Sequence, residues 1–172
     1  ARLTIRGAFP VFKYEQTDAR LLGFDLVTTY QATERFHVTG KYSYLKGEDL
    51  SNKLPLIYMP SNNLYAAFNY QIPEIGKFRN VEIEINNRLV FEQKNLLLSQ
   101  DFVAPPESYH LLGLKISTEK QLSKLRLNLF VKTENLLNTS YRDYLNRQRY
   151  FADDLGFNFI LGDFFVVLFD IW

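Results

Sequence analysis

The sequence VKTENLLNTSYRDYLNRQRYFADDLGFNFIL, residues 131–161, contains the pattern on which the fold depends. It begins with alternating apolar and polar residues, breaks at Asn135 and Asn138, and alternates again from Phe157. A long run of polar and aromatic residues separates the two alternating parts. Because period-two alternation is typical of a strand with one apolar face, this stretch predicts a strand, a long loop and a returning strand.

The same alternation recurs along the rest of the chain. It is strongest in residues 81–94, where Val81, Ile83 and Ile85 alternate with Glu82 and Glu84. We predict eight strands in all, at residues 5–15, 19–31, 36–45, 64–72, 81–94, 109–118, 124–134 and from 157 onward. Pro10 lies in the first of them, which favours an edge or a bulge there because proline cannot donate to a central ladder.

The predicted connections alternate between long and short. The loops at 46–63, 95–108 and 135–156 are long, whereas the turns at 32–35, 75–80 and 119–123 are short. Outer-membrane barrels have long outer loops and short periplasmic turns. A carboxyl end in the periplasm would therefore place the three long loops outside the cell. The connection at 16–18 is tight where this alternation expects a long loop.

Composition argues against several other classes. The 172-residue chain is 47% hydrophobic and 23% charged, and no apolar run approaches the length of about 18 residues that a spanning helix needs. A membrane location therefore requires a closed barrel, which satisfies every backbone polar group in lipid. The net charge of +1 gives no reason to expect nucleic acid. The absence of cysteine excludes disulfides and thiolate metal sites.

No arrangement of residues for catalysis stands out. His37 and His110 are the only histidines, and they lie on different predicted strands without a metal-ligand spacing. The sequence has no glycine-rich phosphate loop and no nucleophile elbow. We therefore expect no enzyme activity, no metal site and no cofactor.

The last loop carries side chains suited to an anionic ligand. Tyr141, Arg142, Tyr144, Arg147 and Arg149 could contact a ligand, or the phosphates of lipopolysaccharide, through charge-assisted hydrogen bonds. The alternative is a loop packed by its own aromatic side chains.

The alternation also predicts a balanced set of charges on the face opposite the apolar side chains. Such charges could line a wide plugged lumen, or they could form structural ion pairs inside a narrow barrel. The set comprises Asp25, Glu82, Glu84, Glu134, Lys41, Arg88, Arg126 and Lys132.

Several ordered motifs resemble the carboxyl-terminal half of TonB-dependent receptors, the plugged barrels that import iron chelates and similar cargo across the bacterial outer membrane. The last loop has Asn-Leu-Leu-Asn at 135–138, Tyr-Arg-Asp-Tyr at 141–144 and Gly-X-Asn-Phe at 156–159. Earlier landmarks are Leu-Gly-Phe-Asp at 22–25, Lys-Gly-Glu-Asp at 46–49, Asn-Asn-Leu at 62–64 and Ser-Tyr-His-Leu-Leu at 108–112. The resemblance therefore spans nearly the whole chain.

The resemblance implies an all-β fold, an antiparallel transmembrane β-barrel with about eight strands in this chain, whereas complete transporters of this kind have about 22. We expect one barrel unit over residues 1–172 and, unlike in these receptors, no plug domain within it. The implied function is the barrel wall and outer loops of a bacterial outer-membrane receptor that imports ferric chelates (siderophores) or similar cargo, with no chemistry of its own. The expected partners are membrane lipid and lipopolysaccharide, together with ferric chelate cargo and a plug domain supplied elsewhere.

The last strand departs from the receptor pattern. Phe159 and Leu161 fit the outward register, but Asp163 holds the next outward position and residues 164–169 are apolar on both faces. Trp172 then falls out of register with Phe159. Either a bulge resets the register, or the residues from Asp163 onward differ from the receptor pattern.

Three other classes remain open from the sequence. The first is a stand-alone eight-stranded outer-membrane barrel, natural or engineered, with a structural or adhesive role and an interior filled by side chains. The second is an outer-membrane enzyme. The third is a soluble lipocalin-like binder, in which the apolar face would point inward.

Overall fold

The computed structural model describes residues 2–4, 7–9, 11, 16–122 and 125–167. One antiparallel sheet dominates this part of the chain, with the strand order β10-β9-β8-β7-β6-β4-β3 and the short β5 paired to β4 as an eighth strand. Its strands are β3 (Ala19–Gln31), β4 (Phe36–Asp49), β5 (Leu54–Pro55), β6 (Asn63–Ile75), β7 (Phe78–Val90), β8 (Tyr109–Leu122), β9 (Leu125–Glu134) and β10 (Asn158–Val167). The predicted all-β, antiparallel, eight-stranded architecture is confirmed.

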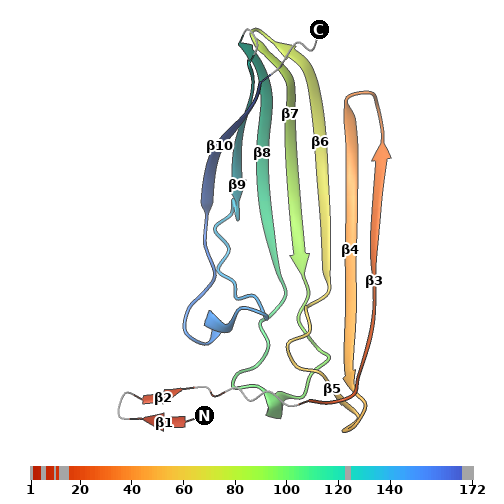
Figure 1. The fold of residues 1–172 in the computed structure, drawn as a ribbon, viewed down its shortest axis with the longest axis vertical. Coiled ribbons are helices and arrows are strands. Elements are labelled where there is room, and N and C mark those ends of the chain that lie inside the picture. Colours follow the sequence, from red (N-terminus) through yellow and green to blue (C-terminus); the bar gives the residue numbers. More distant parts are fainter. Residues whose placement is uncertain (1, 5–6, 10, 12–15, 123–124, 168–172) are drawn as a thin grey trace.

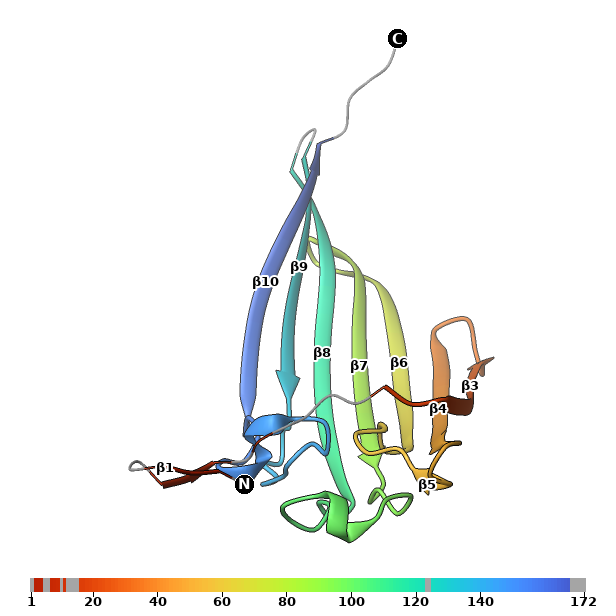
Figure 2. The ribbon, with the colours of Figure 1, turned by 60° about the horizontal axis from the view of Figure 1, so that its bottom comes forward.

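The sheet curves, and its connections differ at its two ends (Figures 1 and 2). Residues 50–62, 91–108 and 135–157 form long loops at one end, which we call the loop end; the single-turn helices η1 (Leu98–Gln100) and η2 (Arg147–Tyr150) lie in the second and third loops. The chain turns tightly at 32–35 and 76–77 at the opposite end, the turn end. The predicted alternation of long and short connections is therefore confirmed for these connections. The turn predicted at 119–123 is different: residues 119–122 belong to β8, and residue 123 lies outside the described part of the chain. No helix in the described part of the chain is long and apolar enough to cross a membrane.

The prediction of a first sheet strand at residues 5–15 is wrong for the described residues. β2 (Gly7–Phe9) pairs with β1 (Arg2–Thr4) in a separate two-stranded ribbon. Residues 5–6, 10 and 12–15, including Pro10, lie outside the described residues. Among the described residues, the tight connection at 16–18 therefore does not join two strands of the main sheet. Instead, it runs along the loop end, where the Leu50 amide donates to the Asp18 carbonyl at 2.8 Å.

The remaining predicted strands form, with changes at their ends. β4 continues past residue 45 to Asp49, because residues 46–49 pair with residues 19–22 of β3. Glu48 and Asp49 also gain Pro55 and Leu54 of β5 as partners. The strand predicted at 81–94 instead spans Phe78–Val90, so that only Gly76 and Lys77 form the turn before it. Gly76 has φ +62° there, in the left-handed region that glycine enters without steric cost.

Cross-strand register divides the side chains between an apolar and a polar face. Phe24 pairs with Tyr44, Phe68 with Ile85, and Ile83 with Ile116, so these side chains share the apolar face. Phe68, Ile85 and Ile116 remain 50%, 48% and 40% exposed, respectively. The opposite, polar face lines cavities of about 560 and 660 Å³, which makes it the concave face. A lipocalin-like interior would need the reverse arrangement.

All eight charges predicted for the inward face lie on the polar face. Glu84, for example, pairs with Lys115 of β8, which in turn pairs with Lys132 of β9. Lys132 Nζ donates to Glu134 Oε1 at 2.5 Å. Glu84 Oε1 accepts from the Tyr65 hydroxyl at 3.1 Å and from the Asn86 amide at 2.8 Å. The polar face therefore combines an ion pair with amide and phenol hydrogen bonds.

The register of β10 decides the question raised by Asp163. β10 pairs with β9 without a shift from Asn158↔Glu134 to Val167↔Leu125. Asp163 therefore pairs with Leu129 and shares the apolar face with Phe159, Leu161 and Phe165. No bulge resets the register within this range, and residues 168–172 lie outside the described part of the chain.

Candidate functional site

The third loop, 135–157, closes at its two ends through asparagine side chains. Asn135 has φ +49° and is only 3% exposed. Its side-chain Nδ2 donates to the backbone carbonyl of Thr139 at 2.8 Å and to that of Leu155 at 3.3 Å. Its Oδ1 accepts from the backbone amide of Thr139 at 2.8 Å. One side chain therefore joins both arms of the loop. This is a structural role for the first asparagine of the Asn-Leu-Leu-Asn motif.

The second asparagine explains the glycine that follows the loop. Asn138 has φ +51°, and its Oδ1 accepts from the Phe157 amide at 2.9 Å. A Cβ at Gly156 would lie 2.5 Å from this oxygen, closer than real contacts allow. Any larger residue at Gly156 would displace Asn138, so the two motifs act together to return the chain into β10.

Two adjacent carboxylates hold the interior of the third loop. Asp154 accepts from the Asp143 amide at 2.7 Å and from the Asn146 side chain at 2.6 Å. Asp153 accepts from the Ser140 hydroxyl at 2.6 Å and from Arg142 Nε at 2.6 Å. The Ser140 hydrogen bond and the Arg142 guanidinium hold the pKa of Asp153 below its usual value.

The third loop reaches the second through a buried ion pair. Arg149 of η2 pairs with Asp101, which follows η1, and the two side chains are 1% and 2% exposed. The Arg149 guanidinium also lies 4.9 Å from the ring centre of Tyr144 and 4.6 Å from that of Tyr150. A buried charge is tolerated only when it is paired, so Asp101 and the two rings make the buried position of Arg149 possible.

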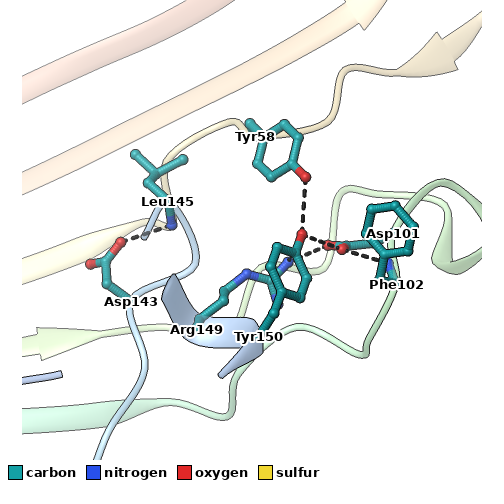
Figure 3. Close-up of polar contacts among 7 residues, drawn as sticks. All are labelled: Tyr58, Asp101, Phe102, Asp143, Leu145, Arg149 and Tyr150. Carbon is teal, nitrogen blue, oxygen red and sulfur yellow. Dashed lines mark hydrogen bonds and ion pairs between the residues drawn. The ribbon is translucent and has the colours of Figure 1, made fainter. Parts of the chain in front are cut away.

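Tyr150 brings the first loop into the same cluster. Its hydroxyl donates to Asp101 Oδ1 at 2.7 Å (Figure 3). The Tyr58 hydroxyl lies 2.9 Å from the Tyr150 hydroxyl. Because Tyr150 already donates its one proton to Asp101, Tyr58 is the donor in this second hydrogen bond. Phe102 packs edge-on against the Tyr150 ring at 5.7 Å. Burial, followed by the hydrogen bonds with Tyr58 and Asp101, raises the pKa of Tyr150. We call Tyr58, Asp101, Arg149 and Tyr150 the loop junction, because they join all three long loops.

The structure separates the five side chains predicted to contact a ligand. Arg149 is buried within the loop junction, with 1% of the residue exposed, and Tyr144 is buried beside it, with 3% exposed. Tyr141 is half-buried against Tyr109, with ring centres 4.6 Å apart. Arg142 and Arg147 are exposed; Arg142 pairs with Asp153, and Arg147 lies 6.0 Å from the Tyr58 ring.

Sequence reasoning missed Tyr58 and Asp101, the partners that the loop junction takes from the other two loops. Asp101 lies 48 positions from Arg149, and Tyr58 lies 92 positions from Tyr150. No local pattern in the sequence connects residues at such separations.

An open cavity of about 450 Å³ lies between the second and third loops, lined by Tyr109, Ser140, Tyr141, Arg142 and Asp153 among others.

The geometry supports a stable assembly of the three loops. The polar contacts of the loop junction run between side chains of the three loops themselves. In the described part of the chain, no group of three or more His, Asp or Glu side chains is placed to hold a metal ion.

The fold is that of an outer-membrane barrel wall. No protein-family model and no curated protein matches the sequence. Among solved structures, one described as "Copper transporter OprC" superposes on 87% of this chain with a TM-score of 0.71 and 19% sequence identity. This chain covers 24% of that structure's length, so it spans about a quarter of it. At this identity the likeness establishes the fold alone.

Proposed function

We propose that this chain forms part of the wall and outer mouth of a bacterial outer-membrane barrel that imports cargo, as a region of a TonB-dependent receptor. The observation that carries the proposal is the division of the curved sheet into an exposed apolar convex face and a polar concave face. Exposed apolar surface of this extent is costly in water, and a transmembrane barrel places it against lipid.

Aromatic side chains on the apolar face support the same orientation. Phe36 pairs with Tyr70 near the turn end, while Phe24 and Tyr44 lie toward the loop end with ring centres 5.7 Å apart. Transmembrane barrels carry aromatic girdles at both interfaces of the lipid. We infer a bacterial outer-membrane location, with the loop end outside the cell and the turn end in the periplasm.

In this proposal the chain performs no chemistry. The three loops joined at the loop junction shape the outer mouth, and the exposed Arg142 and Arg147 contact anionic groups of lipopolysaccharide or of the cargo. The polar concave face lines a lumen that holds a plug domain supplied by another segment. Ferric chelates are the proposed cargo class, on the strength of the sequence motifs.

The stand-alone eight-stranded barrel is less well supported than a wall segment. Such a barrel needs its first and last strands to pair. Within the described residues, β3 and β10 are the two ends of the sheet and do not pair with each other. An open curved sheet fits a larger barrel in which other strands complete the wall.

Labelling of single cysteines on intact cells tests this orientation. Leu145 is 45% exposed in the third loop, and Gln121 is exposed near the turn end of β8. We expect an impermeant thiol reagent to modify Leu145→Cys and to spare Gln121→Cys until the outer membrane is opened. Modification of Gln121→Cys alone would reverse the topology, and equal modification of both would contradict a membrane location.

A further inference from the structure

The two end strands of the sheet leave a free edge each. β10 pairs with β9 on one side, and β3 pairs with β4, but neither has a second neighbour among the described residues. A free edge presents a row of unpaired backbone N–H and C=O groups, which in lipid must be satisfied by another strand. Each edge is therefore a binding surface for a strand, and its geometry restricts which strand fits.

The two edges run in the same direction. Within the described residues, six antiparallel pairings lead from β3 to β10 through β4, β6, β7, β8 and β9. An even number of reversals restores the original direction, so β3 and β10 both run from the loop end to the turn end (Figure 1). A strand that continues the antiparallel sheet beside either edge must run from the turn end to the loop end.

This direction excludes a second copy of the same sheet as the partner. A copy inserted in the same orientation offers only its own β3 or β10 edge, and both run from the loop end to the turn end. Joining the edges of two such copies would give a parallel pair. An inverted copy would run in the right direction but would place its long loops on the opposite side of the membrane.

Asp163 specifies a second property of the strand beside β10. It lies on the apolar face of this edge strand, opposite Leu129, with Leu161 and Phe165 as its neighbours on the same face. Leu161 and Phe165 are 71% and 64% exposed, and Asp163 is exposed as well. A carboxylate facing lipid near the middle of a strand is unfavourable, and a cation on the adjacent strand would offset this cost.

The geometry points to a partner strand for β10 that lies outside the seven long strands of this sheet, runs from the turn end to the loop end, and places a lysine or arginine beside Asp163. This inference rests on the proposed membrane location. It adds the direction and the chemistry of the strand that completes the wall.

Photocrosslinking in the outer membrane tests both properties. p-Benzoylphenylalanine is placed at Leu161 or Phe165, and at Ile85 of the central strand β7 as the matched control. After irradiation, mass spectrometry identifies each adduct. We expect both positions to capture residues of one strand with a lysine or arginine between them, because Asp163 lies between Leu161 and Phe165. The residue captured from Phe165 should precede the one captured from Leu161 in its sequence. Ile85 should capture lipid or its own neighbours in β6 and β8, Phe68 and Leu114, and no other segment.

Each other outcome has a defined meaning. Capture of lipid alone at Leu161 and Phe165, capture of β3 or β10 of a second copy, or the reverse order of captured residues would overturn the inference. Capture at Ile85 of a segment other than β6 and β8, without a lipid adduct, would instead contradict the proposed lipid contact of the apolar face.

A charge reversal tests the basic residue separately. Asp163→Lys should lower the yield of the Leu161 adduct about tenfold, because two like charges would face each other in a medium of low dielectric constant, whereas Asp163→Asn should lower it less. The lipid adduct at Ile85 reports whether the variant still inserts. An unchanged Leu161 yield in Asp163→Lys would exclude a cation beside Asp163.

Discussion

At the scale of single residues, the mouth of the proposed barrel depends on one buried charge. Arg149 is enclosed by the Tyr144 and Tyr150 rings and is neutralised by Asp101 from another loop. The free energy of such a pair depends strongly on both partners, because removal of one leaves the other charge buried and uncompensated. The loop junction is therefore the point at which a small change should release all three loops.

Replacement of Asp101 by asparagine tests this dependence. Asp101→Asn removes the charge that compensates Arg149 and should destabilise the loop assembly by about 3–5 kcal/mol. We expect faster amide hydrogen exchange in residues 91–108 and 135–157, with little change in the central strands β7 and β8. Glu107→Gln is the matched control, because Glu107 is an exposed carboxylate in the same loop. Equal protection in Asp101→Asn and the control would show that the ion pair does not hold the loops.

The lowered pKa of Asp153 predicts a response of the third loop to acid. A carboxyl group whose pKa is lower in the folded state contributes stability above its unfolded pKa of 3.8, and this contribution is lost as pH falls through the lower folded value. As pH is lowered below about 4, the rate at which pepsin cleaves the loop should therefore rise more steeply in the parent than in Asp153→Asn, when the two proteins are compared at the same pH. Parallel curves for the two proteins would contradict the role of the Ser140 and Arg142 contacts.

The sequence predicted individual loop residues only in part. The two motif asparagines could be singled out, because asparagine tolerates positive φ and forms local hydrogen bonds. The burial of Arg149 could not, since a cation between polar neighbours in sequence is usually exposed. Its partner Asp101 becomes evident only once the second and third loops are placed side by side.

At the scale of elements, alternation predicted most of the strands and their faces. Seven of the eight predicted strands form in the main sheet, because period-two patterning matches the two faces of a pleated sheet. The first predicted strand failed in the described residues. There Gly7–Phe9 pairs with Arg2–Thr4, a short local ribbon that alternation alone does not distinguish from a sheet strand.

Arginine substitutions on the two faces of β8 test the assignment of the apolar face to lipid. Ile116 lies near the middle of β8 on the apolar face, and its neighbour Ser117 lies on the polar face opposite Glu82. Ile116→Arg should reduce the free energy of unfolding in a bilayer by about 2–4 kcal/mol. Ser117→Arg should cost much less, because the new cation faces Glu82 and the concave side. The opposite ranking would place the polar face against lipid.

At the scale of the whole molecule, strand number and closure are separate properties. The sequence predicted about eight strands, and the sheet has eight, but the eighth is the short β5 beside β4 rather than a strand between β3 and β10. Closure depends on the directions of the end strands and on partners that hydrophobic patterning does not encode. Periodicity therefore predicted the wall but not whether that wall surrounds a lumen.

The last prediction concerns transport by this chain alone. Because β3 and β10 run in the same direction and do not pair within the described residues, the seven long strands cannot close into an all-antiparallel barrel by themselves. We expect the chain reconstituted in a planar bilayer to show neither a stable single-channel conductance nor uptake of a ferric chelate. In detergent, where no membrane fixes the orientation, an inverted copy can pair antiparallel with a free edge, so we expect concentration-dependent association that cross-linking can measure. A heat-modifiable monomer with a steady conductance would show that the chain closes around a lumen without further strands, which would contradict both the wall-segment proposal and the strand inferred beside β10.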